Sequence, residues 1–208
     1  MSFMNKSWNL ETKTEHLTTL ATSVKMESET AHLHAPLADV LVSANDCLQK
    51  SRQLRLSQLQ ALSRVNSLDR KMDIQSTSLS SGARQAERMN PALRVLGSLF
   101  PEGVTAVTKY SGRGVETQIQ MLKGILTSTD GMPEAASLAP VIAELRTTIA
   151  AAETALAELK AIDEQVEAND RLSDDIAERV YNAYYVTKGE LMKIYINNKR
   201  FINTFFLN

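Results

Sequence analysis

The sequence predicts an all-α protein: an elongated antiparallel bundle of four or more long helices, with coiled-coil-like packing and a shorter, broken helical section in the middle. Three observations lead to this prediction. Apolar residues return at steps of three and four over long stretches. Glycine and proline are scarce, at 8 and 5 residues, and they gather at the boundaries of these stretches. Alternating, β-branched segments bounded by turns, which are typical of strands, are missing from the sequence.

The first half of the chain predicts two long helices. The first covers about Leu10 to Leu33, with Asn9 as its N-cap. Pro36 then breaks the chain and suits the first turn of a second helix, from about Leu37 to Thr77. The second helix carries a long apolar row, in which a register shift is expected between Leu48 and Leu56. The row consists of Leu37, Leu41, Ala44, Leu48, Leu56, Leu59, Leu62, Val65, Leu68 and Met72.

The middle of the chain, about residues 80–129, predicts an insertion or a cap on the end of the bundle. Ser76 to Gly82 is serine-rich and predicts a loop. Asn90-Pro91 predicts the start of a short helix, because asparagine caps well and proline is favoured at the first helical position. Between Val104 and Tyr110 β character competes with helix, and another helix follows over about Val115 to Leu126.

The last part of the chain predicts two more long helices, over about 134–168 and 171–206. The first carries a heptad pattern of apolar residues. The second contains Gly189, which costs about 1 kcal/mol relative to alanine and so suggests a close helix contact. We expect residues 1–208 to form a single domain, since this length suffices for a sizeable core.

Composition limits the function classes. The formal net charge is −1, with 43% apolar and 23% charged residues, values typical of a globular protein and not of a dedicated polyanion binder. The start of the chain lacks the pattern of a secretory signal, and the purely apolar runs are only a few residues long. We therefore expect a cytoplasmic protein. The one cysteine, Cys47, lies in a helical stripe and predicts a buried structural thiol.

Charges are distributed unevenly along the chain. Residues 47–95 contain nine Lys or Arg against three Asp or Glu, whereas residues 130–179 contain four against twelve. The simplest interpretation is that a basic and an acidic helix are neighbours, although exposed ion pairs stabilise little. The alternative is a patch of basic residues that binds phosphates. Nucleic acid is an unlikely partner for such a patch here, because interleaved aromatic residues are absent. The members of the patch would be Lys50, Arg52, Arg55, Arg64, Arg70 and Lys71.

Motifs for catalysis or metal binding are weak. Glu29-Thr30-Ala31-His32 has the Glu-x-x-His spacing of di-iron bundles, but a second copy of the motif is missing and the sequence has only three histidines. Gly112-Arg113-Gly114 is too short for a phosphate-binding loop and lacks its Lys-Ser/Thr ending. We therefore predict no catalytic residue, no metal and no cofactor, and expect that the protein is not an enzyme.

Aromatic residues concentrate at the C-terminus and predict either core or interface. As core, the last helix would lie between two neighbours. As an interface, it would contact an identical subunit, a helical partner or, less well supported, a membrane surface. The interface candidates are Tyr195, Phe201, Ile202, Phe205 and Phe206.

The function predicted from sequence is that of a non-catalytic helical bundle acting through protein–protein interaction or self-association. One alternative is a bundle that binds reversibly to a membrane or lipid surface. Another is a ligand- or metal-binding bundle or an enzyme, with a site between helices.

Overall fold

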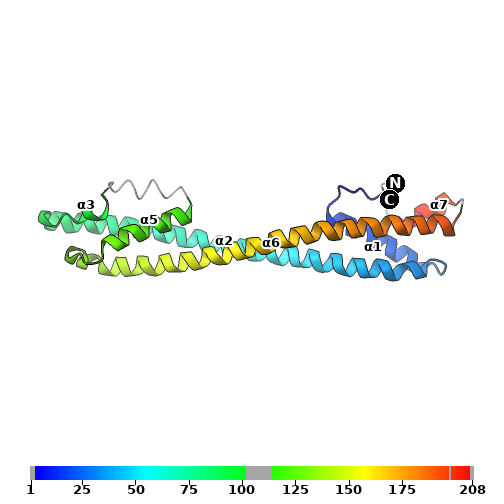
Figure 1. Ribbon diagram of the computed structural model, residues 1–208, viewed down its shortest axis with the longest axis horizontal. Helices are drawn as coiled ribbons and strands as arrows, with labels where there is room; N and C mark the ends of the chain where they lie inside the picture. The colour runs from blue at the N-terminus through cyan, green and yellow to red at the C-terminus, as the bar shows by residue number, and fades with distance from the viewer. Residues whose placement is uncertain (1–2, 102–113, 197, 207–208) are drawn as a thin grey trace. The chain divides into compact units, whose positions relative to one another are not determined.

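The computed structural model describes residues 3–101, 114–196 and 198–206 (Figure 1). Within these ranges every regular element is a helix, which confirms the predicted all-α bundle. Two helices of 56 residues each dominate, α2 (His34–Met89) and α6 (Ala139–Ile194). The shorter elements are α1 (Leu10–Met26), η1 (Ala31–Leu33), η2 (Pro91–Leu93), α3 (Val95–Leu99), α5 (Val115–Ser128), η3 (Pro133–Leu138), α7 (Lys199–Ile202) and η4 (Asn203–Phe205), where η marks a 3-10 helix.

The chain divides into two compact units. Unit 1 consists of Met1–Leu56 and Asp163–Asn208, and unit 2 consists of Ser57–Ile162. Helices α2 and α6 therefore contribute residues to both units. Each unit has its own cluster of buried apolar side chains.

Within each unit α2 and α6 run antiparallel. In unit 1 the Asn169 side-chain amide donates to Ser51 Oγ at 2.7 Å. In unit 2 Arg64 pairs with Glu158 at 2.7 Å. Farther along α2, Gly82 lies beside Leu138, which directly precedes α6. Residue numbers therefore rise along α2 as they fall along the neighbouring α6.

Unit 1 is built around α1, the start of α2 and the C-terminal part of α6. Helix α1 starts as predicted, because Asn9 Oδ1 accepts from the Thr12 amide at 2.9 Å. It ends at Met26 and not at Leu33, because Glu27 is extended and the Thr30 hydroxyl donates to the Val24 carbonyl at 2.9 Å. The largest fully buried side chains of this core are Tyr184, Phe205, Met4, Leu17, Leu20 and Leu37.

Unit 2 packs α5 and α3 against α2 and α6 (Figure 1). Helix α5 covers the predicted Val115–Leu126 segment and extends it to Ser128. The segment opened by Asn90-Pro91 is broken in two at Arg94, whose φ of 45° is left-handed. The expectations for Val104–Tyr110 and for the Gly112-Arg113 part of the turn lie outside the described residues.

The loop predicted at Ser76–Gly82 is wrong, because α2 continues through it to Met89. The hydroxyl groups there donate to carbonyls of the preceding turn, as Ser76 does to Met72 at 2.5 Å and Ser78 to Ile74 at 3.0 Å. Leu79 and Ala83 are fully buried in the core of unit 2. Tertiary packing thus overrides the low helix propensity of serine.

The two helices predicted at 134–168 and 171–206 are in fact one helix, α6, followed by the short α7. Its early heptad residues are buried as the pattern indicates, among them Leu145 and Ile149. Between Ala168 and Arg171 neither glycine nor proline interrupts the backbone, and Asn169 is buried against α2. The polar run there marks a polar contact within unit 1 and not a turn.

By length and mean hydropathy alone, one helical segment of the described chain, Ala135–Ile194, which contains α6 and the end of η3, is apolar enough to cross a membrane. Long core helices of soluble proteins pass the same test, so this finding is weak by itself.

Candidate binding surfaces

A part of the predicted leucine row faces water. Val65 and Met72 are buried, as expected, but Leu56, Leu59 and Leu62 are exposed. The prediction that the whole row packs against neighbouring helices is therefore wrong for these three residues. Helical period identifies side chains on one face, but it does not say whether another helix covers that face.

Leu59 and Leu62 border a hollow of about 470 Å³ on α2, within unit 2. We call this surface the α2 face and define it by Leu59, Leu62, Asn66, Arg70, Lys71 and Ile74. Leu59 is 63% exposed, Leu62 43% and Ile74 68%. Ser63 and Ser67 complete its polar middle.

Two of the six predicted phosphate-binding residues are engaged in ion pairs. Arg52 pairs with Glu11 of α1 at 2.7 Å, and Arg64 pairs with Glu158 of α6 at 2.7 Å. The second pair agrees with the interpretation that the basic and acidic helices are neighbours. Arg70 and Lys71, by contrast, lie together on the α2 face.

A second hollow, of about 420 Å³, lies in unit 1 beside the start of α1. We call it the aromatic pocket. Its walls include Lys6, Trp8 and Lys13 from the N-terminal segment and α1, and Asp174, Glu178 and Tyr181 from α6. Ser7, Asn9 and Ser173 add polar atoms to the same walls.

Lys13 is the unusual residue of the aromatic pocket. Its side chain is only 4% exposed, and within the described part of the chain no hydrogen bond or ion pair holds its ammonium group. The nitrogen lies 5.9 Å from the centre of the Tyr181 ring. Desolvation lowers the pKa of Lys13, Lys6 lowers it further, and Asp174 and Glu178 oppose that shift.

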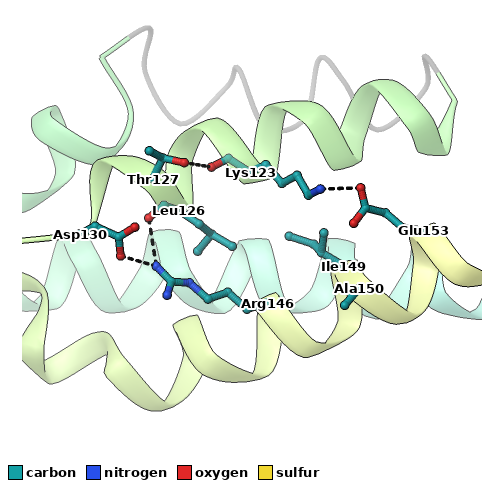
Figure 2. A pocket seen from close by; sticks show the side chains of 8 residues that line it. All are labelled: Lys123, Leu126, Thr127, Asp130, Arg146, Ile149, Ala150 and Glu153. Atoms are coloured by element: carbon teal, nitrogen blue, oxygen red, sulfur yellow. Dashed lines mark hydrogen bonds and ion pairs between the residues drawn. The ribbon is translucent and has the colours of Figure 1, made fainter.

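A third hollow, of about 320 Å³, lies between α5 and α6 in unit 2 (Figure 2). Lys123 and Glu153 form an ion pair at one end, and Asp130 and Arg146 form another at the other end (Figure 2). Arg146 also donates to the Leu126 carbonyl at 3.4 Å, near the C-terminus of α5. Since these charged groups already have partners, we interpret the residues around this hollow as structural contacts between α5 and α6.

The C-terminal interface candidates lie largely inside unit 1. Ile202, Phe205 and Phe206 are buried in its core, while Tyr195 and Phe201 are half-buried against it. The Tyr195 and Phe201 rings meet edge-on, with centroids 4.9 Å apart. This burial agrees with the core interpretation. The interface interpretation stays a prediction.

The histidines and the cysteine are placed separately. His16 is buried against the Trp8 ring, 4.6 Å between centroids, and burial lowers its pKa. His32 of the Glu-x-x-His motif is exposed. Among the described residues, no three His, Cys, Asp or Glu side chains come close enough to hold a metal ion. Cys47 is buried as predicted, and burial raises the pKa of its thiol.

Sequence reasoning missed both the α2 face and the aromatic pocket. The apolar row gave no warning at the α2 face, because it runs without a break through Leu62, Val65 and Leu68. The aromatic pocket had no signal either, since Trp8 and Tyr181 lie far apart in the sequence.

Comparisons of this chain with protein-family models, with curated proteins and with solved structures find no match.

Proposed function

We propose that this chain is a non-catalytic interaction protein that binds an acidic, amphipathic helix of a partner protein on the α2 face. The observation that carries the proposal is the exposure of Leu59, Leu62 and Ile74 beside Arg70 and Lys71. Single exposed apolar residues need no explanation, but an apolar group around a hollow with charged residues beside it is typical of interaction sites.

The geometry of the α2 face suits a helix. Residues 59, 66, 70 and 74 follow each other at steps of seven, four and four, so they lie on one side of α2. From Leu59 to Ile74 this side is about 22 Å long at 1.5 Å per residue, which matches about four turns of a partner helix. A hollow between side-chain ridges accepts the ridge of another helix.

Charge identifies the chemistry of the partner. Of the described residues that line the hollow, two are charged, Arg70 and Lys71, and both are basic. A partner with apolar residues at steps of three and four and with flanking Asp or Glu would complement this surface. A second copy docking by the same face would bring basic groups together, which disfavours self-pairing there.

The polar middle of the α2 face argues against a lipid surface. Ser63, Asn66 and Ser67 lie between the apolar ends. Acyl chains offer these groups no hydrogen-bond partner, whereas a helix surface does. A polar residue such as asparagine inside an apolar seam also fixes the register of paired helices.

The test uses purified full-length protein and a labelled synthetic peptide of about 20 residues, with Leu at a and d positions and Glu elsewhere. We expect saturable binding in fluorescence anisotropy that weakens with salt. The double variant Leu59→Glu, Ile74→Glu should bind about tenfold more weakly or worse.

Matched controls decide the outcome. Val42→Glu and Val186→Glu introduce the same charge at exposed apolar positions of α2 and α6, 61% and 65% exposed, and should leave binding unchanged. A lysine version of the peptide should not bind. The proposal would be overturned if the control variants lost as much peptide affinity as the double variant, or if the lysine peptide bound as tightly as the glutamate peptide. Dimer formation, or binding to anionic vesicles, that depends on Leu59 and Ile74 would also overturn it.

A further inference from the structure

We propose that the aromatic pocket of unit 1 binds a small zwitterion, a molecule that carries both an anionic group and an ammonium group. This site is separate from the α2 face and does not depend on the function proposed for it. Its volume of about 420 Å³ falls in the range of small-molecule sites.

The basic wall of the pocket suits the anionic group. Lys13 is a largely buried residue whose ammonium lies 5.9 Å from the centre of the Tyr181 ring, and Lys6 lies on the same wall. The pocket also contacts Asn9 and Leu10 at the N-terminus of α1, a helix of 17 residues. Backbone N–H groups in the first turn of a helix favour an anion.

The α6 wall suits the cationic group. Asp174 and Glu178 are four residues apart and therefore neighbours on one side of α6, and Tyr181 follows on the next turn. Trp8 lies on the wall from the N-terminal segment. Carboxylates combined with the faces of aromatic rings are the groups that bind an ammonium or quaternary ammonium ion.

The balance of charge selects a zwitterion over a simple ion. Two lysines and two carboxylates line the pocket. A ligand with only a negative charge would be repelled by Asp174 and Glu178, and a ligand with only a positive charge would be repelled by Lys6 and Lys13. A ligand with both charges can give each group an opposite partner.

The sequence supplies a direct probe, because Trp8 is its one tryptophan. Intrinsic tryptophan emission of the full chain would be followed during titration with glycine betaine, with acetate and with choline chloride at constant ionic strength. We expect a saturable change with glycine betaine, and at least a tenfold weaker response to acetate or to choline. No saturable change with glycine betaine, or an equal response to either single-charge probe, would overturn the proposal.

A variant of the lysine tests the anionic side. Lys13→Met keeps the apolar stem and removes the charge, and should weaken glycine betaine binding about tenfold or more. Lys25→Met, at an exposed lysine of the same helix, should bind like the unmodified protein. Equal affinities of the two variants would contradict the assigned role of Lys13.

A second variant covers the case in which Lys13→Met does not fold, as judged by circular dichroism. Glu178→Gln changes an exposed carboxyl group, so folding is not at risk, and it should reduce the preference for glycine betaine over acetate. Asp175→Asn, at a neighbouring exposed position outside the pocket, should keep that preference. An unchanged preference in Glu178→Gln would overturn the zwitterion assignment.

A zwitterion can be a free solute or a lipid headgroup. Phosphatidylcholine vesicles distinguish the two sources. A Lys13-dependent change in Trp8 emission on adding vesicles would place the zwitterion on a lipid, whereas a response to glycine betaine alone would make it a free solute.

Discussion

Two glycines in the long helices lie in different surroundings. A Cβ atom on Gly82 of α2 would lie 2.7 Å from Leu138 Cδ2, whereas a Cβ on Gly189 of α6 would meet nothing within 4 Å. The missing side chain of Gly82 therefore lets the Leu138 side chain pack closely against α2, whereas no neighbouring residue packs closely against Gly189. The prediction that Gly189 marks a close helix contact is wrong.

This difference predicts opposite outcomes for the same substitution. Gly189→Ala should raise the free energy of unfolding by about 0.5–1 kcal/mol, because alanine restricts the unfolded chain and favours helix. In Gly82→Ala the buried Leu138 side chain must move, which should offset that gain or exceed it. Denaturant unfolding measures both. An equal gain in the two variants would show that Leu138 yields without cost.

Burial at single positions was only partly predictable. Leu172, Ile176 and Val180 are spaced four residues apart on one side of α6, and Ile176 and Val180 are buried whereas Leu172 is exposed. Tyr184 is fully buried, and desolvation raises its pKa to about 12. Periodicity ranks the sides of a helix, and neighbouring elements decide how wide the buried side becomes.

At the scale of elements, α2 is continuous where its sequence is serine-rich. Serine weakens a helix because its hydroxyl competes for backbone groups, yet here several hydroxyl groups donate to carbonyls of the preceding turn. Burial of Leu79 and Ala83 keeps the segment helical. Segments of this kind cannot be assigned from propensity alone.

Proline at an exposed position of this segment tests its continuity. Ser78→Pro should lower the free energy of unfolding by about 3 kcal/mol, because proline removes a helical hydrogen bond and clashes with the preceding turn. Ser78→Ala, the control at the same exposed position, should be neutral or slightly stabilising. Calorimetric or denaturant unfolding would measure both, and a Ser78→Pro protein as stable as Ser78→Ala would mean that this segment is a loop.

At the scale of the whole molecule, the described residues form two apolar cores. One gathers the N-terminal segment, α1 and the C-terminal aromatic residues, and the other gathers α3, α5 and the parts of α2 and α6 that pack with them. Because each core has its own residues, substitutions in them should destabilise different parts of the chain.

Hydrogen exchange tests this division. Phe205→Ala should cost about 3–5 kcal/mol and reduce amide protection first in α1 and α7, since Phe205 is buried in unit 1. Leu122→Ala should cost about 2–5 kcal/mol and reduce protection first in α5, since Leu122 is buried in unit 2. Loss of protection in the same amides in both variants would indicate one cooperative unit.

The sequence by itself determined the all-α class, the start of α1 at its Asn9 cap and most of α5, because these depend on local periodicity and capping. Only the tertiary structure decided that α2 and α6 continue through polar segments, that Leu59 and Leu62 face water, and that Trp8, Lys13 and Tyr181 share a pocket. The physical reason is that periodicity is a property of neighbours along the chain. Whether a side chain is covered, and by what, depends on segments that meet only after folding.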